Sequence, residues 1–397
     1  MTNSSRSSAA SRFAGAGAVF ALALCAVSGC GPSDGRQEYA EAGQAYETRN
    51  LVKAENLFAE SARLDPSNVD ALVMLVRARL DLGDLAGAKE AIARAAELAG
   101  DDRDVIELGA QVASHAKDYE GARALYLRLA DAKNDPKVRS QALAGLGVVD
   151  MALNDAQLRS GSRPWMADRA RVEFLQAITL NPGNAAARYH LGILYRDAFG
   201  YIDAALEQLQ FYVKLATEAD PRMQTVQRSV IPDLKDAIGA TLANRPGAAS
   251  RDSAASAAAI KKAEEAWKKG TYKTARQRYE EAFKADPLSY PAALGLAKAW
   301  EKTDASLAGR KHAYDAYRAA CQLRASAVST FLAAGDLAVK LGQHATAVEI
   351  YSRAVAASSK DVSAIDGLIR ALRKTGNAEA ANIYQAYRDT IPVNKRR

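Results

Sequence analysis

Few side chains in this sequence stand where they could do chemistry together. The four histidines are far apart, and none has a cysteine or carboxylate at a metal-ligand spacing. They are His115, His190, His312 and His344. The sequence also contains no nucleophile elbow, phosphate-binding loop or HExxH motif. We therefore expect a protein that is not an enzyme and that needs no metal ion or cofactor.

The three cysteines point to export rather than to disulfide bonds. Cys25 and Cys30 lie near the end of an apolar stretch that follows Arg6 and Arg12, while Cys321 is alone in the rest of the chain. The apolar stretch is too short for a good membrane-spanning helix and is typical of an export signal. Cys321 follows a packing position, so we expect it to be a small buried residue.

The residues Val27–Cys30 resemble the lipobox of bacterial lipoproteins, in which a branched apolar residue and two small residues precede an acylated cysteine. The resemblance implies a signal peptide at residues 1–29, lipidation of Cys30 and a tether at residues 30–35. Gly31 implies sorting to the outer membrane, facing the periplasm, because an aspartate there favours the inner membrane in similar lipoproteins. The alternatives are ordinary signal cleavage and an uncleaved anchor.

The elements that carry the rest of the chain repeat with a period of about 34 residues. In each unit an alanine is followed four residues later by a large apolar residue, and three residues after that comes another packing position. The pairs are Ala54/Phe58, Ala88/Ile92, Ala122/Tyr126, Ala170/Phe174, Ala205/Leu209, Ala275/Tyr279, Ala313/Tyr317, Ala347/Tyr351 and Ala380/Tyr384. These spacings place the three positions on one helical stripe. A turn before each alanine predicts two helices per unit.

This pattern resembles the tetratricopeptide repeat family, in which small residues let paired helices cross closely. The resemblance implies an all-α fold, an α-solenoid of nine helix-turn-helix units, because one pair alone cannot bury its apolar face. We expect two stacks joined by a linker. The predicted parts are an N-terminal stack at 36–221, capping helices at 222–243 with a break at Pro232, a flexible linker at 244–256, a C-terminal stack at 257–391 and a basic tail at 392–397.

Charge is distributed unevenly between the two predicted stacks. Residues 31–243 contain 25 Lys and Arg against 31 Asp and Glu, whereas residues 244–397 contain 26 against 15. The two halves are therefore expected to meet different surfaces. The alternative is that dispersed lysines and arginines only solvate the outer helix faces.

The family resemblance implies that the first helix of each pair lines a concave groove. Matching the groove positions of the family gives a mixed set in the first stack, made of Asp70, Arg77, Asp81, Asp104, Glu107 and Gln111. In the second stack it gives a basic set, made of Lys298, Lys302, Lys340, Arg370, Arg373 and Lys374. We predict that the basic set binds an acidic segment of a protein partner. The carboxylate clamp of some chaperone-associated relatives is missing, because Ile260 and Glu264 occupy its positions.

An insert in the fourth unit includes Trp165 in the sequence GSRPW. Insertions in repeat proteins map to loops or extended helix ends, often on the binding face. Trp165 is thus a candidate partner contact, since aromatic anchors are typical of interface hot spots. The alternative is that Trp165 folds back on its own insert.

Together these patterns predict a membrane-anchored periplasmic scaffold that binds protein partners through its grooves. Similar lipoproteins assist the assembly of pilus secretins and polysaccharide exporters, which is the specific form of the hypothesis. The alternative function is binding of carbohydrate or peptidoglycan, for which Tyr189 and Trp267 provide few aromatic platforms. Nucleic acid is not an expected partner, because the tyrosines mostly fall in packing positions of the repeat.

Overall fold

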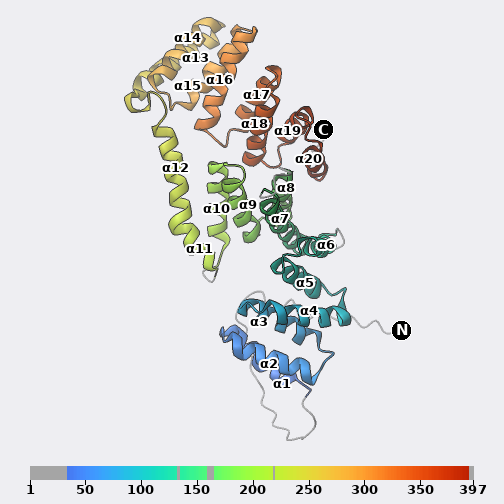
Figure 1. The fold of residues 1–397 in the computed structure, drawn as a ribbon. Helices are drawn as coiled ribbons and strands as arrows, with labels where there is room; N and C mark the ends of the chain where they lie inside the picture. The colour runs from blue at the N-terminus through green and yellow to red at the C-terminus, as the bar shows by residue number, and fades with distance from the viewer. Residues whose placement is uncertain (1–33, 132–134, 159–164, 218–219, 393–397) are drawn as a thin grey trace, which may run out of the picture.

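A computed structural model describes residues 34–131, 135–158, 165–217 and 220–392. The described elements are all helical, with no strand among them (Figure 1). Successive helices pair as helix-turn-helix units that stack on one another, so the predicted all-α solenoid is confirmed.

The first half of the chain contains five helix pairs. They are α1 (Arg36–Glu47), α2 (Leu51–Leu64), α3 (Val69–Leu82), α4 (Leu85–Ala99), α5 (Arg103–His115), α6 (Tyr119–Leu129), α7 (Pro136–Leu158), α8 (Trp165–Leu180), α9 (Ala185–Asp197) and α10 (Ile202–Leu215). Many of these helices begin at a residue whose side chain caps the helix. Asn68, for example, accepts a hydrogen bond from the backbone N–H of Ala71 at the start of α3. Gly83 ends α3 with a φ of 79°, a conformation that favours glycine.

The second half begins with a connecting segment and continues with four pairs. Its helices are α11 (Pro221–Thr225), α12 (Ile231–Ala243), α13 (Ser253–Lys268), α14 (Tyr272–Ala285), α15 (Tyr290–Thr303), α16 (Leu307–Leu323), α17 (Val328–Lys340), α18 (His344–Ala357), α19 (Val362–Lys374) and α20 (Ala378–Asp389). A π-helical turn at Val226–Val230 joins α11 to α12 without an interruption, so the break expected at Pro232 does not occur. The wider turn before the proline relieves the clash of its ring with the preceding backbone.

The expected linker is shorter than its composition suggested. Residues Ala248–Ser250 form a 3₁₀ turn, and α13 begins at Ser253. Asp252 caps this helix by accepting a hydrogen bond from the N–H of Ala255, and its own N–H donates to the carbonyl oxygen of Ala285 at 2.7 Å. The polar residues that looked like a linker therefore include a helix N-cap.

Packing follows the predicted alanine positions closely. All nine alanines that open the pairs named above are fully buried. Glycines also allow close helix packing. A Cβ on Gly335 would lie 2.7 Å from the ring of Tyr351, and one on Gly367 would lie 2.4 Å from it. The aromatic ring thus fills space that only glycine leaves between neighbouring helices.

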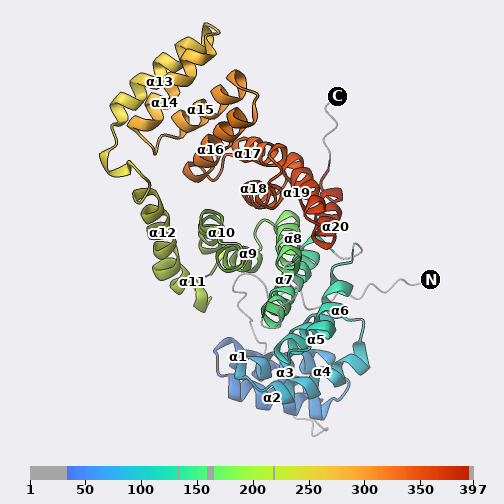
Figure 2. The same cartoon turned by 45° about the horizontal axis from the view of Figure 1, so that its top comes forward.

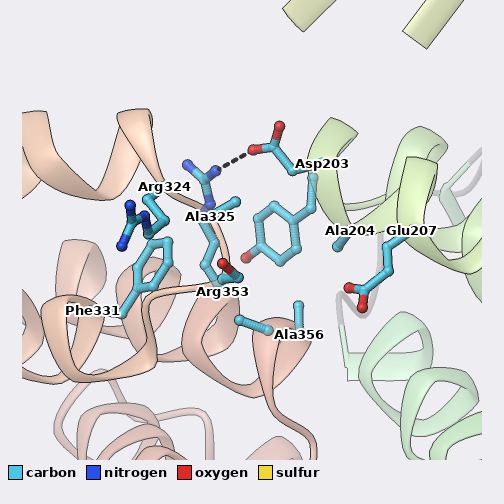
Figure 3. A pocket seen from close by; sticks show the side chains of 11 residues that line it. Asp203, Ala204, Glu207, Arg324, Ala325, Phe331, Arg353 and Ala356 are labelled. Atoms are coloured by element: carbon cyan, nitrogen blue, oxygen red, sulfur yellow. Dashed lines mark hydrogen bonds and ion pairs between the residues drawn. The ribbon is translucent and has the colours of Figure 1, made fainter. Parts of the chain in front are cut away.

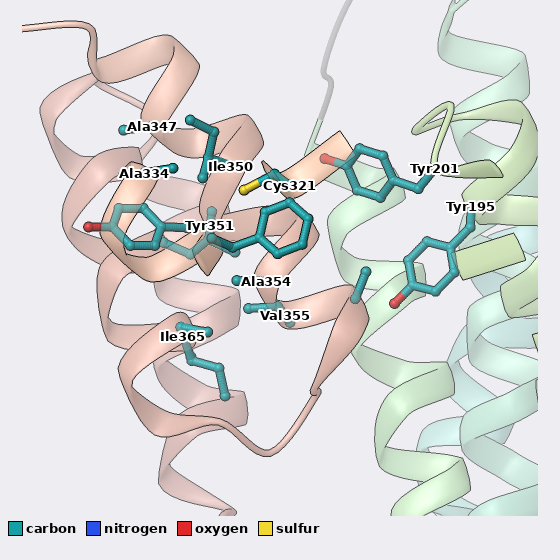
Figure 4. Packing of buried hydrophobic residues seen from close by; sticks show 14 of the residues in the cluster. Tyr195, Tyr201, Cys321, Ala334, Ala347, Ile350, Tyr351, Ala354, Val355 and Ile365 are labelled. Carbon is teal, nitrogen blue, oxygen red and sulfur yellow. The ribbon is translucent and has the colours of Figure 1, made fainter. Parts of the chain in front are cut away.

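The solenoid closes on itself, which the sequence did not indicate. Helix α20 packs against α8, so helices α7–α20 form a ring, while α1–α6 project from it as an arm (Figures 1 and 2). One hydrophobic cluster runs from Ala144 to Tyr387 through the ring. Figure 4 shows Tyr195 and Tyr201 facing the helices of the C-terminal stack across the contact. We call this contact between the two halves the seam.

Arg171 of α8 is at the centre of the seam and is fully buried. Its guanidinium donates to the hydroxyl of Tyr384 through Nε at 2.6 Å and to Oγ of Ser352 at 2.6 Å. Asp168 balances the charge at 3.0 Å and also accepts a hydrogen bond from Tyr384 at 2.6 Å. The charge is therefore paired and hydrogen-bonded, the condition under which a buried arginine is tolerated.

Candidate partner-binding surface

The six basic residues predicted in the second stack are all exposed. Lys298 and Lys302 lie on α15, Lys340 ends α17, and Arg370, Arg373 and Lys374 lie on α19. These are the first helices of their pairs. Among the residues that the structure describes, none of the six side chains forms an ion pair, although Nζ of Lys302 lies 5.3 Å from the ring centroid of Tyr272 and Arg370 interacts with the hydroxyl group of Tyr351.

Spacing along the helices sorts these residues into subsets. Lys298 and Lys302 are four residues apart on α15, as are Arg370 and Lys374 on α19, so each pair shares one helix face. Arg373 differs, because it donates to Oε1 of Gln385 on α20 at 3.4 Å. We call Lys298, Lys302, Lys340, Arg370 and Lys374, which lie on α15, α17 and α19, the basic face, and we leave out Arg373 because its side chain is directed to α20.

Sequence reasoning missed acidic residues on the same helices. The hydroxyl of Tyr351 donates to Asp336 of α17, and that of Tyr317 donates to Glu301 of α15 at 2.6 Å. Burial and the hydrogen bond to Asp336 raise the pKa of Tyr351, so its proton stays in place. The repeated tyrosine position was visible in the sequence, but its reach across to the first helix was not.

In the described part of the chain, the ring closes through the second helices of the repeats. Ser352 belongs to α18 and Tyr384 to α20, and both meet α8. In Figure 2, α18 lies between α17 and the helices α8–α10. Within the described ranges, the contacts that close the ring therefore come from α18 and α20 rather than from α15, α17 and α19.

Family models place this architecture among known repeats. Models described as tetratricopeptide repeat match residues 45–112 in the arm, and residues 260–325 and 332–394 in the ring. These three segments of the chain therefore match tetratricopeptide repeats. Proteins with such repeats mediate protein–protein interactions.

Several solved structures match the chain at low identity. PilF of Pseudomonas aeruginosa is 16% identical, with 54% of this chain and 93% of PilF covered and a TM-score of 0.40. A repeat protein from Parabacteroides merdae is 14% identical, with 77% and 99% covered and a TM-score of 0.36. The first repeat domain of Spaghetti, bound to an HSP90 peptide, is 20% identical, with 32% and 97% covered and a TM-score of 0.28. No curated protein matches the chain.

The repeat groove of the arm is charged, but its groups largely pair with one another. Tyr46 donates to Asp81 at 2.8 Å, and Arg49 lies 3.4 Å from the same carboxylate. Arg77 lies 3.9 Å from Asp104. The arm thus offers fewer open charges than the basic face of the ring.

The predicted aromatic contacts are partly used within the chain. Trp165 opens α8, is half-buried against the ring core and has the guanidinium of Arg169 5.1 Å from its ring centroid. Trp165 thus packs within the chain, its role as a partner contact stays a prediction, and residues 159–164 of the insert lie outside the described residues. Of the two platforms considered for sugars, Tyr189 has Arg222 4.8 Å above its ring, and Trp267 meets Tyr272 edge-on at 5.0 Å.

The histidines and Cys321, which were considered for metal binding or catalysis, do not form a common site in the described part of the chain. His190 stacks on Phe174, and burial lowers its pKa to about 4. Cys321 is buried, which raises its pKa to about 12. In the described part of the chain, no cluster of histidine, cysteine or acidic residues is arranged to hold a metal ion.

The predicted lipidation site, Cys30, lies outside the described residues. None of the described helices combines the length and apolar character that crossing a bilayer requires.

Proposed function

We propose that the protein is a membrane-anchored periplasmic scaffold whose basic face binds acidic segments of partner proteins. The observation that carries this proposal is the basic face itself, five exposed cations on α15, α17 and α19 without an ion pair among the described residues. Assembly of an envelope complex, such as a pilus secretin or an exporter, is the specific role that we propose for the scaffold.

The energetics of exposed charges favour an extended partner. Each exposed ion pair contributes roughly 0.2–1 kcal/mol. The binding free energy of a single carboxylate would therefore be too small for specific recognition. Several acidic residues spread along one segment would engage α15, α17 and α19 together. Such binding should weaken as salt increases, because the Debye length is about 8 Å at physiological ionic strength.

The proposed anchor is the lipobox cysteine, Cys30. Several acyl chains on one residue would hold the protein stably, since each buried methylene contributes about 0.8 kcal/mol. Because α1 begins at Arg36, the arm would lie close to the membrane and the ring would project from it. The basic face would then be presented to partners in the periplasm.

A direct binding experiment tests the basic face. The full chain is titrated into a fluorescein-labelled peptide of alternating glutamate and alanine, and fluorescence anisotropy gives the Kd. Reversing four charges (Lys298→Glu, Lys302→Glu, Arg370→Glu, Lys374→Glu) should weaken binding by roughly tenfold or more. The matched control reverses four exposed charges on second helices, Lys273, Arg310, Lys311 and Arg318. Equal weakening by both sets would leave only general charge attraction and refute a specific face.

A separate experiment tests the anchor. Replacing the acylated residue, Cys30→Ala, should abolish incorporation of a labelled palmitate analogue and release the protein from a carbonate-washed membrane pellet. Cys321→Ala is the matched control and should change neither result, because Cys321 is buried in the ring. Retention of the Cys30→Ala variant in the washed pellet would contradict lipid anchoring.

A further inference from the structure

A cavity of about 300 Å³ lies in the seam, and none of the basic-face residues lines it (Figure 3). Both halves of the chain line it. Helix α10 contributes Ala204 and Glu207, and Tyr201 precedes it. The turn between α16 and α17 contributes Arg324, and α18 contributes Arg353 and Ala357. A ligand in this cavity would contact residues more than a hundred positions apart in the sequence, which meet only when the ring is closed.

One pair of charges in the cavity is already satisfied. Nη2 of Arg353 lies 3.3 Å from Oδ2 of Asp203. The same guanidinium lies 5.8 Å from the ring centroid of Tyr201 and 5.5 Å from that of Phe331. Arg353 is therefore held between two aromatic rings and one carboxylate, and it acts as part of the wall.

Two further charged residues, Arg324 and Glu207, line the cavity and form no ion pair among the described residues. Arg324 lies over the ring of Tyr290, 4.1 Å from its centroid, which fixes its guanidinium at one end. Glu207 stands at the other end, and partial burial raises the pKa of its carboxyl group, with Arg188 opposing the shift. Between them the alanines of α10 and α18 leave room, and the aromatic rings supply an apolar surface.

We propose that the seam cavity binds a zwitterion of dipeptide size, with its carboxylate on Arg324 and its ammonium group on Glu207. The volume is at the lower end of small-molecule sites, which suits a ligand with two small side chains. An opposite charge at each end and an apolar middle match the chemistry of a free dipeptide. This site is independent of the basic face and of any acidic segment bound there.

The proposal also predicts an effect on the ring. A ligand that binds only when both halves are in contact stabilises the closed state by mass action. Bound dipeptide should therefore raise the Tm of the ring in proportion to the logarithm of its concentration above Kd. A ligand bound to one half alone would not need the seam to be intact.

The test uses the full chain and L-alanyl-L-alanine in isothermal titration calorimetry. We expect saturable binding that falls roughly tenfold or more for Arg324→Gln and for Glu207→Gln, since each loses a charged contact. N-acetyl-L-alanyl-L-alanine amide, which has neither charge, should not bind. Arg310→Gln and Glu379→Gln, both exposed and outside the cavity, are the matched controls and should bind as the wild type does.

A steric variant separates loss of the site from loss of folding. Ala357→Leu fills the cavity, keeps both charges and should abolish binding while circular dichroism stays unchanged. No heat of binding to the wild type at millimolar dipeptide would overturn the proposal. Equal affinity for the capped peptide, or undiminished affinity in Ala357→Leu, would overturn it as well.

Discussion

The arm and the ring are built from the same repeat but are stabilised differently. In the described part of the arm, contacts stay local, between helices one or two positions apart along the stack, and its buried residues form two small clusters, one in α1–α5 and one in α5–α7. In the ring, α8 also meets α18 and α20, and one cluster spans both halves of the chain. A local repeat thus gives an open stack in one region and a closed structure with long-range contacts in the other. Closure should make the ring cooperative, whereas the arm should unfold as a sum of units.

Removing Arg171 should break this comparison most strongly. In Arg171→Met, Asp168 and the hydroxyl of Tyr384 lose their buried partner, which should cost the ring about 3–5 kcal/mol. All three tryptophans lie in the ring, so urea unfolding followed by tryptophan fluorescence reports on it alone. The arm variant Arg128→Met removes an exposed pair with Asp101 and should cost less than about 1 kcal/mol, followed by circular dichroism. Similar costs for both variants would contradict a special role for the seam.

Two glycine substitutions should change the free energy of unfolding in opposite directions, one in the ring and one in the arm. Gly367→Ala in the ring places a Cβ 2.4 Å from the ring of Tyr351 and should destabilise by about 1–3 kcal/mol. Gly43→Ala in α1 meets no atom within 4 Å and should stabilise the arm by roughly 0.5–1 kcal/mol. Thermal unfolding measures both changes. A stabilising Gly367→Ala would mean that the close approach of Tyr351 is absent in solution.

The junction between arm and ring should respond to pH. Glu173 of α8 is buried beside Asp150 of α7, with Arg123 of α6 3.9 Å away and Arg169 bound to Asp150. Burial, with the nearby Asp150, raises the pKa of Glu173 well above its usual value. A raised carboxyl pKa means that the folded state holds the proton more tightly, so stability should fall as pH rises from about 4.5 toward neutral.

Replacing this carboxyl group should remove that pH dependence. Glu173→Gln keeps the shape and cannot ionise, so at neutral pH it should be more stable than the wild type by about 1 kcal/mol or more. Urea unfolding at a series of pH values measures the difference. Glu120→Gln, exposed on the arm, should retain the wild-type profile. If Glu173→Gln also keeps that profile, the carboxyl group is not protonated at the junction.

The repeat and its packing were predictable because they depend on local spacing. An alanine and an aromatic residue four positions apart identify a helix crossing wherever they occur, and Ala347 and Tyr351 lie as expected. The seam was not predictable, because it depends on the small rotation added by every repeat between α8 and α20. Arg171 follows directly after a packing alanine, and nothing in its neighbours indicates that Tyr384 will cover it.

The candidate site was predictable only in part, for a related reason. The exposed cations follow from the charge imbalance and the helix positions, and the four-residue spacing places Lys298 with Lys302 and Arg370 with Lys374 on shared helix faces. The side chain of Arg373 is directed toward Gln385 of α20, and the spacing of residues along one helix does not predict a contact with another helix. Asp336 and Glu301 escaped notice because their tyrosine partners come from the following helix.

Hydrogen exchange in a truncated chain tests the closed ring most directly. Deleting residues 359–397 removes α19 and α20, and the protection of the α8 amides is then compared with that in the full chain. The account predicts that α8 loses protection, although it lies far from the deletion in sequence, while α1–α4 exchange as before. Unchanged protection of α8 would show that the two halves are independent stacks and would contradict the ring.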